Sequence, residues 1–258
     1  GMKVTIMGAG ASSGVPYVSG EWGACDPAEP RNRRSRASIL IEADDARIVV
    51  DTGPDFREQF LAAGSGRIDG VIYTHAHADH VHGIDDLRAI NSQMKRQIPA
   101  YGYTECLDEV ARRFAYVFAD PTPERGWFRP SLGANPITGG DLAIGGARLR
   151  LFEQDHGVCR TVGIRAGDIA YSTDVVQLDA DALRALKGVK TWIVGCLRRE
   201  PHFVHAGLDQ VMAWADVIGP ERVILTHMNA TMDYGTLCAE LPSGIEPGYD
   251  GLVLDGKD

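Results

Sequence analysis

One short stretch indicates what kind of protein this chain is: Val71-Ile72-Tyr73-Thr74-His75-Ala76-His77-Ala78-Asp79-His80. Its first three residues form an apolar run typical of a buried strand, so the polar residues that follow lie on the loop leaving that strand. Imidazole and carboxylate are ligands that borderline divalent metals prefer. The alternating spacing lets His75 and His77 bind one ion while Asp79 and His80 face a second. An ordinary solvated loop is the alternative interpretation.

Three more potential ligands follow apolar runs later in the chain. They are His156 after Leu149–Phe152, Asp174 after Ile169–Thr173, and His227 after Val223–Thr226. A single histidine after a strand is more often structural than functional. Three such positions, in this order after the first cluster, favour one shared metal centre.

The ordered pattern HxHxDH, His, Asp, His resembles the ligand signature of the metallo-β-lactamase superfamily. The resemblance covers essentially the whole chain and implies an α/β fold, an αββα sandwich of two mixed sheets flanked by helices. It also implies two divalent metal ions, zinc or manganese with iron as a further option, at one edge of the sheets. Carried over residue by residue, it assigns His75, His77 and His156 to one ion, Asp79, His80 and His227 to the other, Asp174 to the bridge, and Asp51 to a supporting role outside the ligand set.

Other segments resemble the phosphodiesterase branch of this superfamily, the PhnP-like proteins. They are Gly8–Pro16, Asn32–Ser38, Pro201–His205, and the pair Asp233–Tyr234 and Glu246–Gly251. Many members of this branch carry a cysteine cluster for a structural zinc near the N-terminus. Only Cys25 stands in that region here, so we predict no structural zinc and a small, buried Cys25.

The resemblance implies hydrolysis of a small phosphate ester, foremost a cyclic phosphate of a sugar or nucleotide, by a hydroxide that bridges the two metals. Asp79 would orient the attacking hydroxide while it binds metal. His205 is our candidate general acid, because imidazole titrates near neutral pH. Ser12, Ser13 and Arg33 are candidate phosphate-binding residues.

Spacing separates some competing functions. A tRNA 3′-processing nuclease of this superfamily inserts a long arm between the second-motif histidine and the bridging aspartate, whereas only 18 positions separate His156 from Asp174. A glyoxalase II adds a helical domain after the last ligand, and 31 residues follow His227. A thioester or lactone hydrolase stays open, as does a metal-binding protein without turnover.

Composition limits the partners and the location. The chain has 258 residues, 44% hydrophobic and 24% charged, ordinary values for a soluble globular protein, and we expect one domain over residues 1–258. Gly1 before Met2 is typical of a cloning remnant. The formal net charge of −9 argues against a long nucleic acid as partner, because nonspecific affinity depends on cationic contacts with phosphate.

No run of 18 apolar residues occurs, and the N-terminus lacks the apolar segment of a signal peptide. The five cysteines are scattered, as in proteins of a reducing compartment. We therefore expect a cytoplasmic protein without a membrane partner. A homodimer is compatible with these features.

Apolar runs and helical periodicity predict strands alternating with helices. The predicted strands are Lys3–Met7, Ser38–Ile41, Arg47–Val50, Gly70–Thr74, Ala147–Phe152, Thr161–Ile164, Ile169–Ser172, Thr191–Gly195, Arg222–Thr226 and Leu252–Leu254. The predicted helices are Pro54–Ala63, Ile84–Met94, one capped by Thr104, and Leu208–Ile218.

Overall fold

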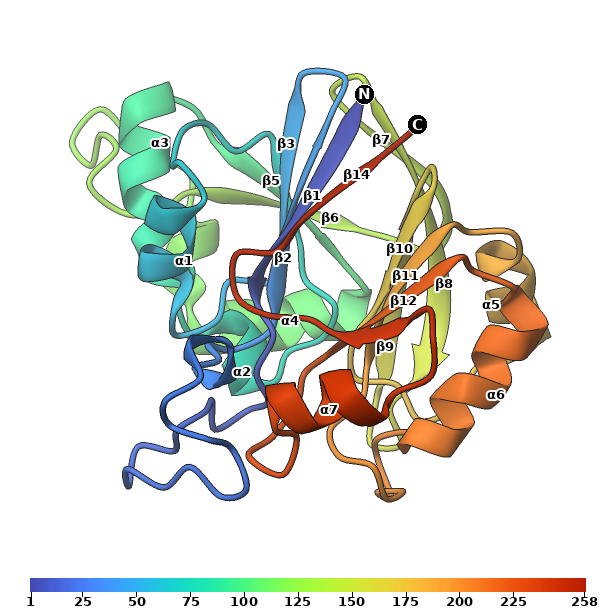
Figure 1. Cartoon of the computed structure of the whole chain (residues 1–258). Helices are drawn as coiled ribbons and strands as arrows, with labels where there is room; N and C mark the ends of the chain where they lie inside the picture. The colour runs from blue at the N-terminus through green and yellow to red at the C-terminus, as the bar shows by residue number, and fades with distance from the viewer.

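The computed structural model describes residues 1–258 and contains two seven-stranded sheets facing each other (Figure 1). The first sheet has the spatial order β14 (Val253–Gly256), β1 (Met2–Gly8), β2 (Ser38–Ala43), β3 (Ala46–Val50), β4 (Gly70–Ile72), β5 (Ile98–Gly102) and β6 (Leu132–Pro136). The second has the order β13 (Ile245–Pro247), β12 (Arg222–Thr226), β11 (Thr191–Gly195), β10 (Ile169–Ser172), β9 (Arg160–Ala166), β8 (Ala147–Asp155) and β7 (Gly140–Ile144).

Each sheet changes from antiparallel to parallel pairing at a single strand. In the first sheet, the strands from β14 to β3 pair antiparallel and those from β3 to β6 pair parallel. In the second sheet, the same change occurs at β10. Loops leaving the carboxyl ends of β3 and β10 therefore begin where the pairing pattern changes. Ligands of open α/β sheets commonly bind outside the carboxyl ends of the strands.

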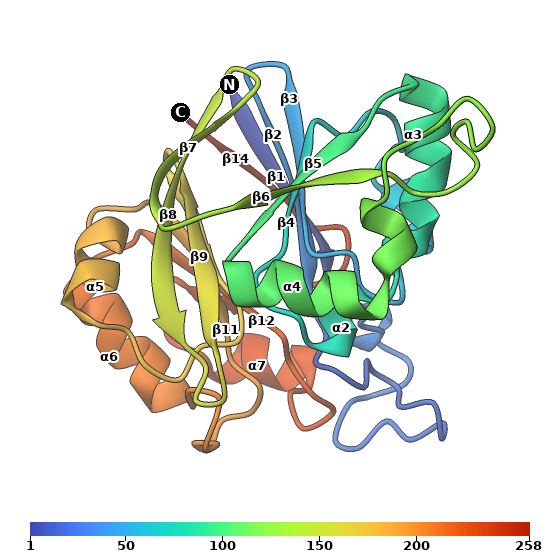
Figure 2. The ribbon, with the colours of Figure 1, turned by 180° about the vertical axis from the view of Figure 1, so that it is seen from behind.

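Helices flank the outer faces of both sheets. In Figures 1 and 2, α1 (Phe56–Ala62) and α3 (Arg88–Met94) lie outside the first sheet, and α5 (Ala180–Leu186) and α6 (Leu208–Ile218) lie outside the second. The remaining helices are α2 (Ala78–Val81), α4 (Thr104–Arg113), α7 (Tyr234–Glu240) and the 3₁₀ turns η1 (Pro30–Asn32), η2 (Ile84–Leu87) and η3 (Ala115–Phe118). This layered arrangement confirms the predicted sandwich.

One continuous cluster of buried apolar side chains lies between the sheets and under the flanking helices, and it includes Ile41 and Ile48 of the first sheet and Trp192 and Ile193 of the second. Burial of this area is the main force that holds the two sheets together. Each of the ten predicted strands overlaps an observed strand, and continuous apolar runs mark those that are buried on both faces.

Two helix predictions need correction. The segment predicted as one helix over Ile84–Met94 is divided into η2 and α3. Thr104 is the first residue of α4, and Tyr103 occupies the capping position with extended backbone angles. Strands β5, β6, β7 and β13 and helices α2, α5 and α7 were not predicted.

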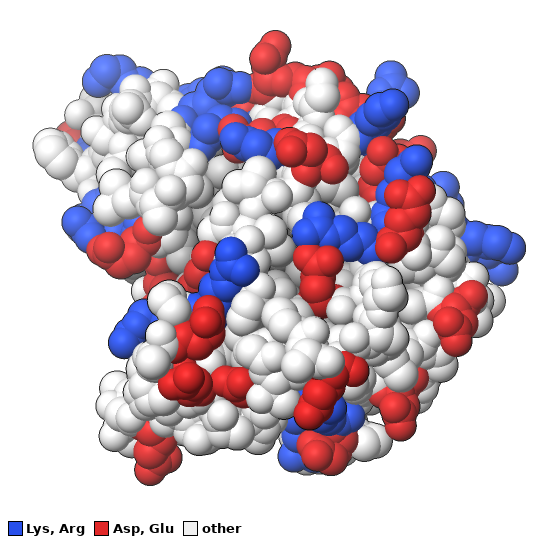
Figure 3. Space-filling view, viewed as in Figure 1, with Lys and Arg blue, Asp and Glu red and all other residues white.

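None of the helices is both long and apolar enough to cross a membrane. Acidic and basic side chains are interspersed on the face shown in Figure 3, and no continuous basic area forms on that face.

Candidate metal centre

The seven candidate ligands come from loops and one short helix at one edge of the two sheets. They are His75 and His77 after β4, Asp79 and His80 on α2, and His156, Asp174 and His227 after β8, β10 and β12. These strands run in the same direction within each sheet, so their carboxyl ends lie at the edge that α2 marks near the bottom of Figure 1.

The donor atoms form two groups, and Asp174 belongs to both. Within each group the atoms lie within 4.8 Å of one another: His75, His77, His156 and Asp174 in the first, and Asp79, His80, Asp174 and His227 in the second. The Oδ2 atom of Asp174 lies 3.5 Å from His75 Nε2 and 3.4 Å from His156 Nε2. The Oδ1 atom lies 3.1 Å from His80 Nε2 and 3.2 Å from His227 Nε2. Each carboxylate oxygen thus faces a different set of imidazoles.

The charges and unpaired donor atoms of this cluster favour bound cations. The Nε2 atoms of His75 and His80 are buried and have no hydrogen-bond partner. Burial would raise the pKa of Asp174, but the imidazoles of His227, His80 and His75 hold it well below its usual range. Buried carboxylates and unpartnered imidazole nitrogens are the donor set that divalent cations satisfy. The residues therefore fit the metal ions that the sequence predicts.

Asp51 holds the metal loop through three hydrogen bonds. Its Oδ1 accepts from the backbone N–H of Thr74 at 2.8 Å, and its Oδ2 accepts from Thr74 Oγ1 at 2.7 Å and from His80 Nδ1 at 2.6 Å. The bond to Nδ1 fixes the ring of His80 and directs Nε2 toward Asp174. Such contacts around metal ligands orient them and set the ligand tautomer.

Two contacts in the same region were not predicted from the sequence. The Nδ1 atom of His156 lies 2.8 Å from the backbone carbonyl of Val204, which fixes its ring. The guanidinium of Arg113 donates to the carbonyl of Ala76, the residue between two candidate ligands. A contact with a backbone carbonyl cannot be recognised from a sequence. In the sequence, Arg113 is one of several charged residues at the end of an amphipathic helix, so nothing indicates its contact with Ala76.

Three residues of the centre adopt left-handed backbone conformations. The φ angles are +65° for Asp51, +49° for Asp174 and +54° for His227. This region is uncommon for residues other than glycine, and such strain persists where surrounding structure enforces it. Here it turns the chain sharply at the ends of β3, β10 and β12.

His205 lies directly beside the cluster. Its ring centroid is 4.9 Å from that of His156 and 5.1 Å from that of His227, nearly parallel to the latter. Burial, together with the neighbouring imidazole of His227, lowers the pKa of His205 to about 3. By contrast, burial would raise the pKa of Asp79, but the imidazoles of His80 and His227 hold it far below its usual range. The carboxylate is thus ionised and the imidazole of His205 neutral.

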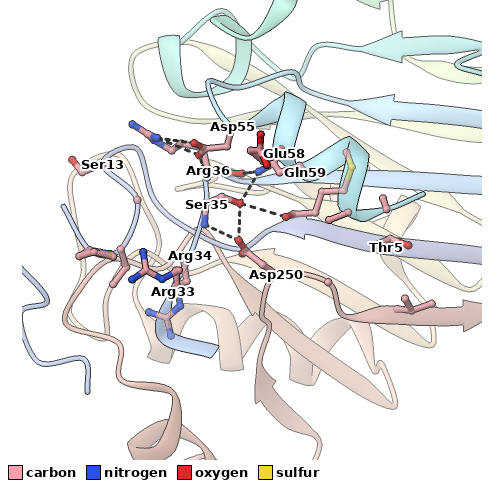
Figure 4. A pocket seen from close by; sticks show the side chains of 18 of the residues that line it. Thr5, Ser13, Arg33, Arg34, Ser35, Arg36, Asp55, Glu58, Gln59 and Asp250 are labelled. Carbon is pink, nitrogen blue, oxygen red and sulfur yellow. Dashed lines mark hydrogen bonds and ion pairs between the residues drawn. The ribbon is translucent and has the colours of Figure 1, made fainter. Parts of the chain in front are cut away.

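The candidate phosphate-binding residues lie elsewhere. Ser13 and Arg33 line a cavity of about 640 Å³ between α1 and the strands β1 and β14, and none of the seven candidate ligands lines it (Figure 4). The carbonyl of Ser12 accepts a hydrogen bond from Arg36 at its rim. A separate cavity of about 280 Å³ borders His75 and His77. The predicted roles of Ser12, Ser13 and Arg33 stay predictions.

The segment Asn32–Ser38 is held by side-chain contacts. The pairs are Asn32 Nδ2 to Asp233 Oδ1 (2.7 Å), Arg34 Nη2 to the Met232 carbonyl (2.6 Å), Ser35 Oγ to Asp250 Oδ2 (2.6 Å) and Arg36 Nη1 to Asp55 Oδ1 (3.1 Å). Figure 4 shows the contacts of Ser35 and Arg36 in the wall of the larger cavity. Three of the segments that resemble the PhnP-like branch thus hold one another in place through side-chain contacts.

Cys25 is buried, as predicted, and packs with Val15 and Ala230 in a small apolar cluster. The guanidinium of Arg34 lies 3.6 Å from its sulfur and also bonds the carbonyls of Asn229 and Met232. These contacts tie the N-terminal loop to the loop that follows His227.

A family model described as "Beta-lactamase superfamily domain" matches residues 46–228, which is most of the chain and includes all seven candidate ligands. The chain belongs to the metallo-β-lactamase superfamily. Its fold is similar to that of a crystal structure described as a new diphosphatase from the PhnP family. That structure has a TM-score of 0.91 and 28% identity, covering 100% of this chain and 98% of the other.

Two curated relatives have different names. A protein named octanoyltransferase from Porphyromonas gingivalis (strain ATCC BAA-308 / W83) is 32% identical over 267 residues, covering 99% of this chain and 52% of that protein. A ribonuclease Z from Bradyrhizobium sp. (strain ORS 278) is 32% identical over 126 residues, covering 46% of this chain and 39% of that protein. The chain thus spans about half the length of these relatives, or less. Fold, ligand set and the PhnP-like and ribonuclease Z relatives together support a metal-dependent hydrolase.

Proposed function

We propose that this PhnP-like protein is a binuclear, metal-dependent phosphodiesterase that hydrolyses a small cyclic phosphate of a sugar or nucleotide. The observation that carries the proposal is the placement of Asp174, whose two oxygens face two separate sets of imidazoles. His75, His77 and His156 would hold one ion, Asp79, His80 and His227 the other, and Asp174 would bridge them. The similarity to a PhnP-family diphosphatase supports phosphate-ester chemistry over the other reactions of the superfamily.

Two divalent ions bound there would activate water as a nucleophile at neutral pH and offset the charge that develops on the phosphate oxygens. Asp79 would orient the attacking water through its ionised carboxylate. As the new phosphorus–oxygen bond forms, the bond to the ester oxygen breaks and that oxygen needs a proton. His205 lies beside both ligand sets and would supply this proton once the anionic phosphate offsets the effect of the neighbouring imidazoles.

A metal assay combined with turnover of three substrates tests the proposal. Purified protein should contain about two equivalents of transition metal, and His77→Ala should lose much of it. His82 is the matched control, since it is an exposed histidine whose ring contacts Phe114 rather than the cluster. The substrates are bis-p-nitrophenyl phosphate, a 2′,3′-cyclic nucleotide and a thioester. Thioester hydrolysis without phosphodiester turnover would place the protein among the thioester hydrolases. Metal binding without turnover of any of the three substrates would favour a metal-binding protein over an enzyme.

The role of His205 has its own test. His205→Ala should slow hydrolysis of an alkyl or ribosyl cyclic phosphate roughly 10²–10⁴-fold, the usual contribution of general acid catalysis. The same variant should lose much less activity on a p-nitrophenyl ester, whose leaving group needs no proton. Metal content should not change. Equal losses on both esters would show that His205 binds substrate instead, and lost metal would make it a ligand.

A further inference from the structure

The segment His202–His205 forms a tight turn that is fixed to the metal centre. His202 and His205 exchange backbone hydrogen bonds of 3.1 and 3.3 Å, and the N–H of Val204 donates to His202 Nδ1 at 3.2 Å. The carbonyl of Val204 contacts the candidate ligand His156. The next residue, Ala206, donates to the carbonyl of Val175 at 2.9 Å. The tip of this turn therefore has a defined position relative to the candidate ligands.

Phe203 stands at that tip and is 84% exposed. Its ring stacks on that of His202, with the ring centroids 4.3 Å apart and an angle of 23° between the ring planes. The ring of His202 lies 5.4 Å from that of His205, which in turn contacts the rings of His156 and His227. A row of rings thus runs from the metal centre to the surface and ends in an exposed phenyl ring.

A second exposed apolar side chain lies on a loop that packs against this turn. Gly157 packs closely against Phe203 and Val204, because a Cβ at this position would lie 3.4 Å from the Phe203 carbonyl and 3.0 Å from Val204 Cγ1. The residue after it, Val158, is 67% exposed. Two loops that flank the ligand His156 therefore present apolar groups to solvent, where turns usually carry polar residues.

We propose that Phe203, stacked on His202, is a platform for the nucleobase of the substrate, so that the preferred ester is a nucleoside cyclic phosphate rather than a bare sugar phosphate. This inference rests on the proposed phosphodiesterase function. A sugar can contact a phenyl ring only through its C–H groups, whereas every nucleobase has a π-face that stacks on an aromatic side chain. The ordered backbone of the turn holds such a ring in a fixed position at the surface end of the row of rings that starts at the metal centre.

Paired substrates test the platform. The two esters are a nucleoside 2′,3′-cyclic phosphate and methyl riboside 2′,3′-cyclic phosphate, which lacks the base. Phe203→Ala should raise KM for the nucleoside ester roughly 5- to 150-fold, the range expected when one stacked base loses its partner. Its kcat should stay near the wild-type value, because stacking acts on ground state and transition state alike. Both constants for the base-free ester should be unchanged.

Two further variants separate a stacking role from a structural one. Phe203→Trp keeps an aromatic face and should restore the low KM, while Phe203→Leu keeps apolar area and should not. Phe128, 79% exposed in the segment between η3 and β6, is the matched control, and Phe128→Ala should leave both esters unaffected.

The outcomes distinguish this inference from the function on which it rests. Wild-type hydrolysis of the base-free ester would support the phosphodiesterase function whatever Phe203 does. Equal losses on both esters in Phe203→Ala, or no loss on either, would overturn the platform while that function stands. A selective loss on an acyl thioester would instead assign the ring to an acyl chain. Failure of the wild-type protein on both esters would overturn function and platform together.

Discussion

The substitution Asp51→Asn tests how the centre is built, because it keeps the shape of the side chain and changes only what its atoms donate and accept. Asp51 is fully buried, and each of its oxygens accepts from a donor of Thr74 or His80. An asparagine must turn its NH₂ group toward one side. If the NH₂ group points toward the backbone of Thr74, two N–H groups face each other. If it points toward His80, it needs an acceptor there, so the ring proton of His80 must move from Nδ1 to Nε2.

The second arrangement damages metal binding directly. The Nε2 atom of His80 lies 3.1 Å from oxygens of both Asp79 and Asp174 and is the atom that would bind metal. Loss of an oriented contact around a metal ligand typically lowers metal affinity 10- to 100-fold. The lost charged hydrogen bond also lowers the stability of the metal-free protein by about 1.5–3 kcal/mol. For a protein of this size, that corresponds to a fall in Tm of roughly 3–12 °C.

The measurement is a competitive metal titration against a chelator, with calorimetry of the metal-free protein. Asp55→Asn is the matched control, since Asp55 pairs with Arg36 and contacts none of the candidate ligands. It should leave metal affinity unchanged. If Asp51→Asn binds metal within threefold of wild type, the carboxylate does not set the tautomer of His80, and the reasoning fails.

Three other substitutions probe separate parts of the molecule. Asp174→Ala should abolish turnover and reduce metal content while circular dichroism shows a folded protein; wild-type kcat would refute the bridge. Arg34→Met should lower the free energy of unfolding by about 1.5–3 kcal/mol, because it removes hydrogen bonds to buried carbonyls. The control Arg33→Met, at an exposed position, should change it by less than about 0.5 kcal/mol. Equal effects of the two variants in denaturant titrations would contradict the structural role of Arg34. Asp233→Ala removes the cap of α7 and should cost about 0.5–2 kcal/mol at neutral pH. Burial would raise the pKa of Asp233, but hydrogen bonds from the backbone and from Thr236 and Asn32 lower it to about 2, below its ordinary 3.8. Its contribution is therefore present above pH 4 and lost as the pH falls toward 2, and an equal difference from wild type at pH 7 and pH 2 would refute this.

The predictable parts of the fold were those with strong local signals. Strands such as β2 and β12 are buried on both faces and appear as unbroken apolar runs. Three of the four missed strands, β6, β7 and β13, are sheet edges. Edge strands need little apolar surface, and proline is tolerated there, as at the ends of β6 and β13. Their local sequences resemble turns because their pairing depends on neighbours that are distant in the chain.

The candidate ligands could be proposed from the sequence because four of them share one HxHxDH motif and the other three lie one or two residues after a strand. The surroundings could not. The left-handed conformations of Asp51, Asp174 and His227 depend on the loops packed around them. Ser35 and Arg36 bond to Asp250 and Asp55, and these partners lie too far along the chain to be recognised from spacing.

The two sheets show why one aspartate supports the centre while another would bind its ions. Asp51 and Asp174 follow β3 and β10, the strands at which each sheet changes its pairing, and both have positive φ. The oxygens of Asp51 face N–H and O–H groups, so its lone pairs are engaged by the protein. Those of Asp174 accept one hydroxyl, from Thr173, and otherwise face imidazole nitrogens. Equivalent backbone positions thus acquire different roles through the donors around them, and a metal bound by Asp51 would first have to displace the hydrogen bonds that hold His80.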